Sequence, residues 1–398
     1  MSGLPGHPGV SGLPGHPGVS GLPHDDLGTA WRAARPRPAV VHLSTAACGR
    51  QSNRVLDAVA RHARSEAEIG ASAAEESVEG LLQQARSVLA GLVGMAAADL
   101  AFTESATASV RTVLGRWQLP VGTRVGVLPG EYWHNLAVLA DLGLSPVLLP
   151  ADDLGRADLA GIERVLHDDP PALVHVTLVG SHRGVVQPGR EIAALCSAAG
   201  VPLVLDVAQA LGHVDCDLGA DVAYAPARKW LAGPRGVGLL VMRPWITAQL
   251  TPVVGPELLD DGGAGLDHAR WYESYDAHVA GRVGLAVAVG EHLAAGPDRV
   301  RSRLAGLGRA TRERLDGRGG WSVVEPLDEP TAITTLRPPD GVDVRATAAR
   351  LSAEHGVLVT PVGRERARGE LTGPVLRVSP HLDATLDDLA ALAAGLTR

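Results

Sequence analysis

The chain has 398 residues, a formal net charge of −8 at pH 7 and no run of basic side chains, which argues against a nucleic-acid-binding protein. Its three cysteines lack paired spacing, so neither a disulfide framework nor a zinc site is predicted. No apolar stretch reaches membrane-spanning length, and the N-terminus lacks the features of a secretory signal. These properties favour a reducing cytosol. Apolar residues make up 45% of the chain, enough to fill one large domain and a smaller one.

The first 24 residues are expected to lie outside the fold. Residues 2–23 repeat SGLPGHPGV twice and begin it a third time, with glycine at every third position. Seven triplets are too few for a collagen triple helix, so a disordered tail, or a start codon placed too early, is the better interpretation. Ordered sequence is predicted from Asp25 onward.

Short apolar strands alternate with helical segments from Asp25 to residue 245, and this pattern predicts an α/β domain. Its mostly parallel sheet is expected to carry helices on both faces. The predicted strands are 40–44, 100–103, 125–128, 147–149, 173–177, 202–205, 221–224 and 237–241. The predicted helices are 31–36, 53–69, 78–93, 108–118, 136–142, 159–167 and 190–199.

From about Pro244 the pattern changes, which predicts a smaller α+β domain over residues 246–398. Two long helical segments come first, and short strands and a last helix follow. These segments are the helices 279–295 and 297–315, the strands 322–324, 332–335, 357–360 and 376–379, and the helix 387–396.

Lys229 is the only lysine in the chain, whereas all other basic side chains are arginine or histidine. Arginine stays protonated, but a lysine amine can lose its proton and attack a carbonyl to form a Schiff base. We therefore interpret Lys229 as a reactive amine. A chance survivor on the surface is the alternative.

Other polar groups are predicted at the carboxyl ends of strands, where ligands bind in open α/β sheets. Ser105–Thr107 follows a strand and opens a helix, so its backbone N–H groups and hydroxyls suit a phosphate; an ordinary capped helix start is the alternative. Asp206 ends the strand PLVLD, either as a helix cap or as the partner of a buried cation. Gln209 follows and can bond a ligand oxygen.

Together these groups predict a site for pyridoxal 5'-phosphate (PLP). The cofactor needs an amine for its aldehyde, an acid for its pyridine nitrogen, a phosphate cradle and a flat group over its ring. Lys229, Asp206 and Ser105–Thr107 supply the first three, and an aromatic residue of EYWHN (131–135) supplies the last. A carboxylate beside the pyridine nitrogen favours its protonated form.

Three motifs resemble the signature of the class V aminotransferases, a family of fold type I PLP enzymes that includes the cysteine desulfurases. They are DVAQALGH (206–213), GAD (219–221) and RKWLAGPRGVG (228–238). The resemblance covers roughly residues 30–398. It implies a fold type I architecture, a PLP cofactor and a homodimer.

The resemblance also implies roles for individual residues. Lys229 is the implied Schiff-base lysine, Asp206 is the implied partner of the pyridinium nitrogen, and Gln209 is the implied contact to the phenolic oxygen. Ala106 and Thr107 are implied to contact the phosphate. Tyr132 is implied to stack on the ring, and Arg377 is implied to bind the substrate carboxylate. Relatives often have serine and histidine where this chain has Pro226 and Arg228, so Arg228 is expected to replace a lost phosphate contact. Trp133 and His134 are alternatives to Tyr132.

Further stretches resemble one branch of the family, the lyases that cleave the C–S bond of a sulfoxide-bridged conjugate of histidine betaine and cysteine. They include CGRQS (48–52), LPGEY (128–132), SHRGVVQP (181–188) and EPTAITTL (329–336). A cysteine desulfurase is one alternative, but residues 361–376 lack the cysteine that such an enzyme needs. A non-catalytic binding or regulatory module is another, and the presence of Lys229 and Asp206 argues against it.

Several residues are weaker candidates for substrate contacts. His182 and Arg183 follow a predicted strand, and Cys48 lies in a polar turn; each has a structural role as its alternative. His213 and His381 are expected to be structural.

The chain is poor in aromatics, with one Phe, four Tyr and seven Trp, yet Trp271, Tyr272 and Tyr275 lie close together beside Glu273 and Asp276. Aromatic faces and carboxylates suit a trimethylammonium group. The family resemblance implies that this segment can reach the active site of a partner subunit, so these residues are candidates for its betaine pocket. Packing at the interface or the domain junction is the alternative.

Overall fold

The computed structural model describes residues 22–253 and 268–397. Of the predicted tail, residues 1–24, the first 21 residues lie outside the described part of the chain. Leu22 is already buried, and Arg303 Nη1 donates hydrogen bonds to the carbonyl oxygens of Pro23 and His24. Residues 22–24, which precede the predicted start of ordered sequence at Asp25, are therefore packed against the fold. Within the two described ranges, no helix has the length and apolarity needed to cross a bilayer.

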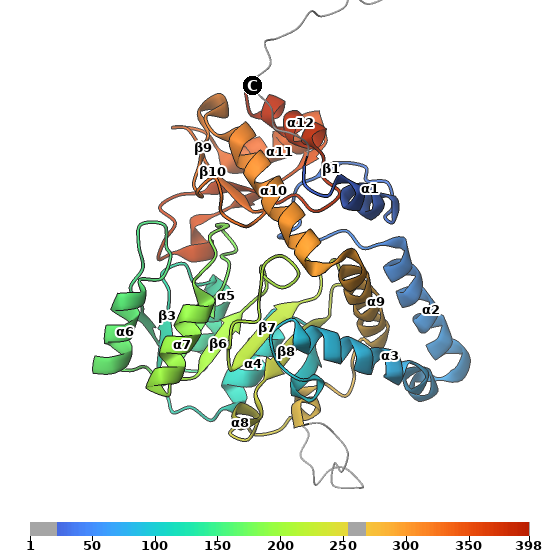
Figure 1. Cartoon of the computed structure of the whole chain (residues 1–398), viewed down its shortest axis with the longest axis vertical. Coiled ribbons are helices and arrows are strands. Elements are labelled where there is room, and N and C mark those ends of the chain that lie inside the picture. The colour runs from blue at the N-terminus through green and yellow to red at the C-terminus, as the bar shows by residue number, and fades with distance from the viewer. Residues whose placement is uncertain (1–21, 254–267, 398) are drawn as a thin grey trace, which may run out of the picture.

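A seven-stranded sheet forms the centre of the larger domain (Figure 1). β8 runs antiparallel to both of its neighbours, and all other neighbouring strands run parallel. The predicted mostly parallel sheet is therefore confirmed. The strands lie in the order β2 (Leu100–Thr103), β8 (Gly238–Met242), β7 (Val222–Pro226), β6 (Leu203–Asp206), β5 (Leu173–Thr177), β3 (Arg124–Val127) and β4 (Ser145–Leu148).

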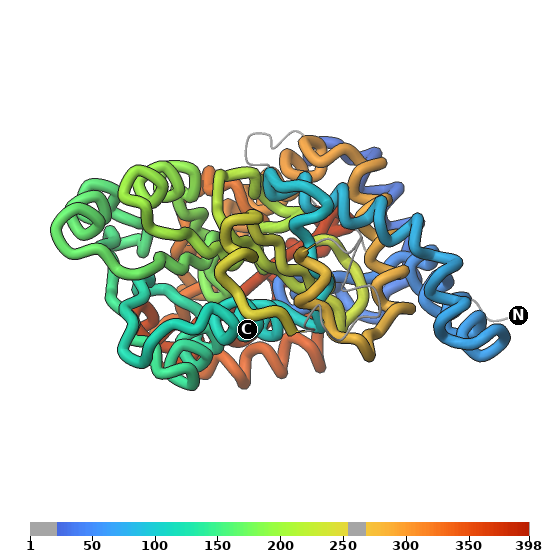
Figure 2. Tube along the Cα trace, turned by 90° about the horizontal axis from the view of Figure 1, so that it is seen from below, coloured from blue at the N-terminus to red at the C-terminus, as the bar shows by residue number. Residues whose placement is uncertain are grey.

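Helices cover both faces of this sheet, which explains why its central strands are apolar along their whole length. In β7, Ala223 and Ala225 belong to the apolar cluster on one face, and Val222 and Tyr224 belong to the cluster on the other. The helices of this domain are α2 (Asn53–Ile69), α3 (Ala71–Gly91), α4 (Ala106–Arg116), α5 (Trp133–Asp141), α6 (Leu159–Asp168), α7 (Gly189–Ala199) and α8 (Pro244–Thr247). Figure 2 shows α2 projecting at one end of the molecule, opposite α6.

The smaller domain is built on an antiparallel sheet of four short strands, as predicted for an α+β unit. The strand order is β12 (Thr360–Val362), β13 (Val375–Val378), β10 (Thr334–Arg337) and β9 (Ser322–Val323). Its helices are α10 (Pro297–Leu315), α11 (Val344–His355) and α12 (Leu386–Leu396), with a short 3-10 helix η5 (Arg364–Ala367). The sequence reasoning missed α11, although the Asp343 side chain caps its N-terminus by accepting from two backbone N–H groups.

Two segments pack on a different domain from the one to which they were assigned. α9 (Val279–Ala295), predicted in the smaller domain, packs against α2 and α3. The N-terminal arm, α1 (Asp25–Ala33) and β1 (Val41–His42), was assigned to the larger domain. It packs instead on the smaller one, because β1 pairs with β11 (Val357–Leu358) and the ring of Trp31 stacks on His381. Local sequence patterns carry no information about these long-range contacts.

Candidate active site

A cavity of about 160 Å³ opens at the carboxyl ends of β5, β6 and β7. This is the position where polar groups were predicted to converge. The structure brings eight predicted residues into its lining: Ser105, Ala106, Thr107, Tyr132, Asp206, Gln209, Arg228 and Lys229.

Lys229 lies three residues beyond β7 and is half-buried at the cavity wall. Burial lowers the pKa of Lys229 to about 7, and Arg228, Arg377 and Arg366 contribute in the same direction against the attraction of Asp206. A substantial fraction of the amine is therefore neutral at neutral pH. A neutral amine is the form that acts as a nucleophile or a base.

Asp206 is 4% exposed at the end of β6. Its Oδ2 accepts a hydrogen bond from Asn135 Nδ2 at 2.9 Å, and its Oδ1 accepts one from the backbone N–H of Ala208 at 2.8 Å. Burial raises the pKa of Asp206, and the nearby Glu131 adds to this effect, whereas Lys229 and Asn135 oppose it. Asp206 is thus a buried carboxylate fixed in orientation and in need of a cationic partner.

The sequence reasoning missed a polar network beneath Asp206. Glu131, which is 1% exposed, accepts hydrogen bonds from Thr177 Oγ1 at 2.6 Å and from Asn135 Nδ2 at 2.9 Å, and its Oε2 lies 3.0 Å from His175 Nδ1. Although burial works against charge, this pairing raises the pKa of His175 and holds that of Glu131 below its usual value. The spacing of Glu131 and Asn135, four residues apart in EYWHN, was the available signal.

The N-terminus of α4 faces the cavity through Ser105, Ala106 and Thr107. Ser105 Oγ caps the helix by accepting from the N–H of Ala108 at 3.1 Å, so the hydroxyl keeps its proton for a ligand. A Cβ on Gly238 would lie 2.9 Å from the carbonyl carbon of Ser105. Strand β8 therefore approaches the helix start as closely as glycine allows. Arg228 adds a cation to the lining, so the N-terminus of α4 and this guanidinium together suit a phosphate.

Two aromatic rings line the cavity, those of Tyr132 and His134, with ring centroids 5.1 Å apart and planes at 82°. Trp133 does not line it and is 40% exposed. Tyr132 and His134 therefore both remain candidates for the stacking group. Gln209 is fixed by Trp230 Nε1, which donates to its Oε1 at 3.0 Å, and by its own Nε2, which donates to the carbonyl of Ala46 at 2.9 Å. One N–H of that amide remains for a ligand.

Arg377 lies on β13, 1% exposed, and reaches toward the cavity by donating from Nη1 to the carbonyl oxygen of Ser181. Arg377 Nε and Ser181 Oγ are both buried and have no hydrogen-bond partner within residues 22–253 and 268–397. Buried groups of this kind are normally satisfied, so these two indicate a missing polar ligand. The amine, the carboxylate, the helix N-terminus and these donors fit PLP and an amino-acid carboxylate.

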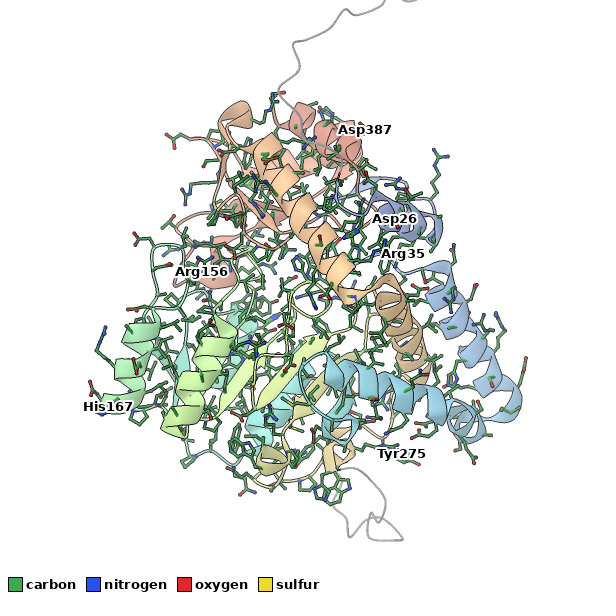
Figure 3. The ribbon with its side chains drawn as sticks, viewed as in Figure 1. Asp26, Arg35, Arg156, His167, Tyr275 and Asp387 are labelled. Atoms are coloured by element: carbon green, nitrogen blue, oxygen red, sulfur yellow. The ribbon has the colours of Figure 1, made fainter. Side chains whose placement is uncertain are left out.

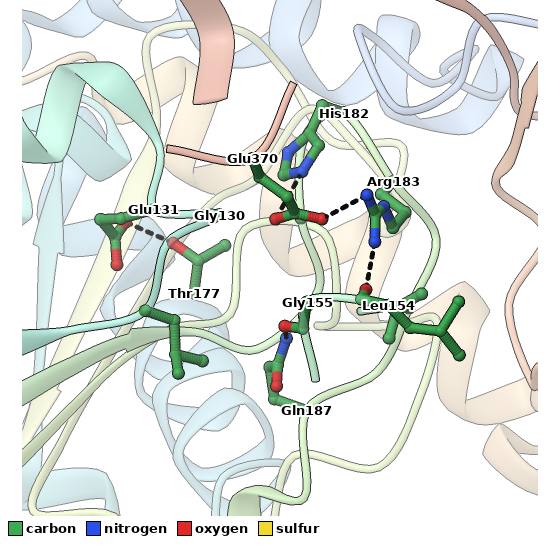
Figure 4. A pocket seen from close by; sticks show the side chains of 12 residues that line it. Gly130, Glu131, Leu154, Gly155, Thr177, His182, Arg183, Gln187 and Glu370 are labelled. Carbon is green, nitrogen blue, oxygen red and sulfur yellow. Dashed lines mark hydrogen bonds and ion pairs between the residues drawn. The ribbon is translucent and has the colours of Figure 1, made fainter. Parts of the chain in front are cut away.

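His182 and Arg183 do not line this cavity. They lie in a second, smaller one, where both pair with Glu370: His182 Nε2 lies 3.1 Å from Oε2 and Arg183 Nη2 lies 2.7 Å from Oε1 (Figure 4). Glu370 belongs to the smaller domain, so this cluster joins the two domains. Cys48 also lies outside the lining; its thiol contacts only the carbonyl of Gly49 within the described chain, at 3.6 Å.

The aromatic group at 271–275 lies away from the cavity in this chain. The Tyr272 hydroxyl donates to the carbonyls of Thr247 and Leu250, and its ring packs in the core with Trp271 at the edge. Tyr275 is fully exposed at the lower edge of the molecule, far from the smaller domain (Figure 3). The proposal that they bind a betaine depends on a second subunit and stays a prediction.

Glu273 does not offer the free negative charge that was expected of it. It is 9% exposed and pairs with Arg86 and with Arg282 Nη1, the latter at 2.9 Å. Its carboxylate therefore bridges two buried arginines and offsets one of their two positive charges.

His213 and His381 have structural contacts. His213 Nε2 accepts from the N–H of Ala332 at 2.8 Å, and burial lowers its pKa to about 3. His381 Nε2 lies 3.0 Å from the carbonyl of Trp230.

The sequence profile of the family described as aminotransferase class-V matches residues 41–392, most of the chain. The chain belongs to the class V aminotransferase family. With the fit of the cavity to PLP, this membership makes it a PLP-dependent enzyme.

Known proteins agree with this assignment. The chain is 48% identical over 373 residues to a "probable hercynylcysteine sulfoxide lyase" of Mycobacterium tuberculosis (strain CDC 1551 / Oshkosh), covering 94% of this chain and 93% of the relative. Among solved structures, the apo cysteine desulfurase of Thermococcus onnurineus NA1 superposes with a TM-score of 0.80 at 21% identity, covering 95% and 98% of the two chains. A C-DES mutant with glycine covalently linked to its PLP cofactor gives 0.82 at 19% identity, covering 92% and 98%. At such identities these structures establish the fold type I architecture.

Proposed function

We propose that this enzyme is a carbon–sulfur lyase that cleaves hercynylcysteine sulfoxide by β-elimination. Pyruvate and ammonia leave, and the sulfur leaves as a sulfenic acid that a thiol reduces to ergothioneine. The observation that carries the proposal is the 48% identity to the mycobacterial relative over nearly the whole of both chains, together with the cavity around Lys229 and Asp206. We further propose that the enzyme is a homodimer.

Each residue at the cavity would have a separate role in this reaction. Arg377 would hold the substrate carboxylate with two donated hydrogen bonds, because a guanidinium matches a carboxylate geometrically. The Lys229 amine, neutral in part at pH 7, would take the α-proton. When bound, PLP supplies an electron-poor ring that accepts the electron pair of the broken C–H bond. Asp206 would keep that ring's nitrogen protonated, which its burial and fixed orientation allow.

The cysteines favour a lyase over the alternative, a cysteine desulfurase. None of the three cysteines lines the cavity. Cys196 and Cys216 are buried in the core, and burial raises the pKa of Cys196 to about 12. A sulfur acceptor must be a reactive thiolate within reach of the substrate. We therefore expect sulfur to leave on the imidazole and not on the protein.

The test uses the PLP-loaded full-length enzyme with hercynylcysteine sulfoxide and a thiol reductant, and follows pyruvate and ergothioneine. Both products are expected in equal amounts. The Lys229→Ala variant should lose at least about 100-fold in kcat, because a positioned base contributes about 10²–10⁴. Borohydride should fix the cofactor to Lys229 in the wild type only. Release of sulfide from free cysteine at a higher kcat/KM than sulfoxide cleavage would show a desulfurase instead.

A further inference from the structure

One arginine beside the active-site cavity has no assigned partner. Arg366 lies on η5, and its Nε is buried without a hydrogen-bond partner in the part of the chain that the structure describes. η5 packs against α5, the helix that Tyr132 caps and whose first turn contains His134. Its two arginine neighbours on η5 and just after it, Arg364 and Arg368, are exposed.

The segment that carries Arg366 is held firmly against the rim of the cavity. A Cβ on Gly369 would lie 2.5 Å from the carbonyl oxygen of Pro129, so the two backbones are in close contact. The next residue, Glu370, lies between His182 and Arg183, as Figure 4 shows. Its carboxylate also covers Gly130, where a Cβ would clash with it. Arg366 is therefore fixed beside the loop that carries Tyr132.

Arg366 lies within charge–charge range of three groups around the cavity. After burial, it is the charge that lowers the pKa of His134 and of Arg377, and it contributes to lowering that of Lys229. Arg228 and Lys229 line the cavity beside one carboxylate, that of Asp206. Arg366 and Arg377 add positive charge that acts on Lys229 from the smaller domain, and Glu131 adds negative charge that acts on Asp206. Positive charge that is buried at Arg377 and partly buried at Arg228, Lys229 and Arg366 favours anionic or strongly accepting ligands.

The cofactor and the substrate of the proposed reaction carry such groups, and each group can be assigned to one of the four cations. Arg228 and the α4 N-terminus would hold the PLP phosphate, and Arg377 would hold the cysteine carboxylate. Lys229 provides the amine. The substrate has one further accepting group that would lie near both Lys229 and Arg377. It is the sulfinyl oxygen, which is bonded to the sulfur on the β-carbon. The betaine carboxylate of the same substrate lies beyond the imidazole ring and is farther from these groups.

We propose that Arg366 binds the sulfinyl oxygen of the substrate and stabilises the sulfenate that leaves. This inference rests on the proposed function. As the bond between the β-carbon and sulfur breaks, both electrons stay on sulfur, and negative charge develops on its oxygen. The α-proton has gone to the Lys229 amine. The sulfenate is protonated after release, and a thiol reduces it outside this step. A guanidinium placed where charge develops lowers the barrier to cleavage.

The experiment compares Arg366→Gln with wild type on three substrates: hercynylcysteine sulfoxide, S-methylcysteine sulfoxide and β-chloroalanine, whose leaving group has no oxygen. The kcat/KM for both sulfoxides, relative to β-chloroalanine, is expected to fall about 100-fold, as removal of one donor to a developing oxyanion does. Arg366→Lys, which keeps a cation, should recover most of that ratio. The matched control, Arg364→Gln, changes an exposed arginine of the same 3-10 helix and should leave the ratio unchanged.

A binding measurement adds a readout that does not depend on turnover. L-Cysteate carries oxygens on its β-sulfur, whereas L-alanine does not, and both can be titrated against the cofactor absorbance. Arg366→Gln should weaken cysteate binding at least ten-fold more than alanine binding. Equal losses on all three substrates and both ligands would overturn the inference, as would a loss confined to the betaine substrate, which would place the betaine carboxylate on Arg366. If the wild type cleaves β-chloroalanine but neither sulfoxide, the proposed function itself fails.

Discussion

At the residue scale, the cavity lining carries more positive than negative charge, with Arg228 and Lys229 beside the single carboxylate of Asp206. Arg228, Arg366 and Arg377 repel the charge of Lys229, and Arg366 repels that of Arg377; burial lowers the pKa of both Lys229 and Arg377. A site of this kind is strained in the apoprotein and relieved by anionic ligands. The residues proposed to bind the ligands are therefore expected to limit the stability of the apoprotein.

The first prediction concerns the pH dependence that Lys229 imposes on stability. Its pKa is about 7 in the folded chain and near 10.5 in the unfolded chain, so between these values the unfolded state binds more protons. Stability from this group is lowest below pH 7 and rises as the pH increases toward 10. Apo Lys229→Met should therefore melt above apo wild type at pH 6.5, and the difference should narrow by pH 9. A difference in melting temperature that stays constant would contradict the pKa shift.

The second prediction concerns Asn135, which donates from Nδ2 to both Glu131 and Asp206. Asn135→Asp keeps the shape but places a third carboxylate between two buried ones. We expect the free energy of unfolding to fall by about 3–5 kcal/mol, the cost of an uncompensated buried charge, as measured by urea denaturation. Asn53→Asp, at the exposed start of α2, is the control and should be neutral or slightly stabilising. A loss below about 1 kcal/mol for Asn135→Asp would mean that the network tolerates the charge.

At the scale of single elements, glycines show how helix packing limits the choice of residue. Gly308 on α10 lies so close to the smaller domain's loop that a Cβ would be 1.8 Å from the carbonyl oxygen of Thr331. Gly290 on α9 has open space where a Cβ would lie. The first glycine is required by packing, and the second only weakens its helix.

The third prediction uses these two glycines as a matched pair. Gly308→Ala should destabilise the protein by about 1–3 kcal/mol, because α10 or the Thr331 loop must move to accommodate the methyl group. Gly290→Ala should stabilise it by about 0.5–1 kcal/mol through its higher helix propensity. Urea midpoints measure both changes. Shifts in the same direction for the two variants would show that α10 does not pack as closely as described.

At the scale of the whole molecule, ion pairs link the two domains. Arg156 Nη2 on the larger domain lies 2.6 Å from Glu329 Oε2 on the smaller one, and Figure 3 places Arg156 at this junction. Glu370 pairs with His182 and Arg183 a short distance away. Because Arg377 and Arg366 belong to the smaller domain, these links set the position of both arginines relative to Lys229.

The fourth prediction concerns assembly. We expect a homodimer, and light scattering combined with chromatography should give about twice the mass of 41.1 kDa. Tyr275→Ala then tests the betaine hypothesis, since this ring is fully exposed in the single chain. A raised KM for hercynylcysteine sulfoxide with an unchanged KM for S-methylcysteine sulfoxide is expected. A monomer that remains active when dilute would refute both expectations.

Local sequence determined most of the helices and strands, although not α11, and several of the residues that line the cavity. Alternating apolar strands and helices predicted the mostly parallel sheet. Asp206 and Lys229 lie at or just beyond the ends of strands, and Ser105–Thr107 lies at the start of α4, so their places in the fold follow from these elements. Their convergence follows from parallel topology, because all carboxyl ends of the parallel strands lie at one edge.

Only the tertiary structure decided which distant segments meet. It placed Glu131, His175 and Asn135 beneath Asp206, paired Glu370 with His182 and Arg183, and moved the N-terminal arm onto the smaller domain. It also showed that Tyr272 and Glu273 are buried in the core. A sequence shows the type and spacing of side chains, whereas the environment of a side chain depends on neighbours far along the chain, and burial and pKa follow from that environment.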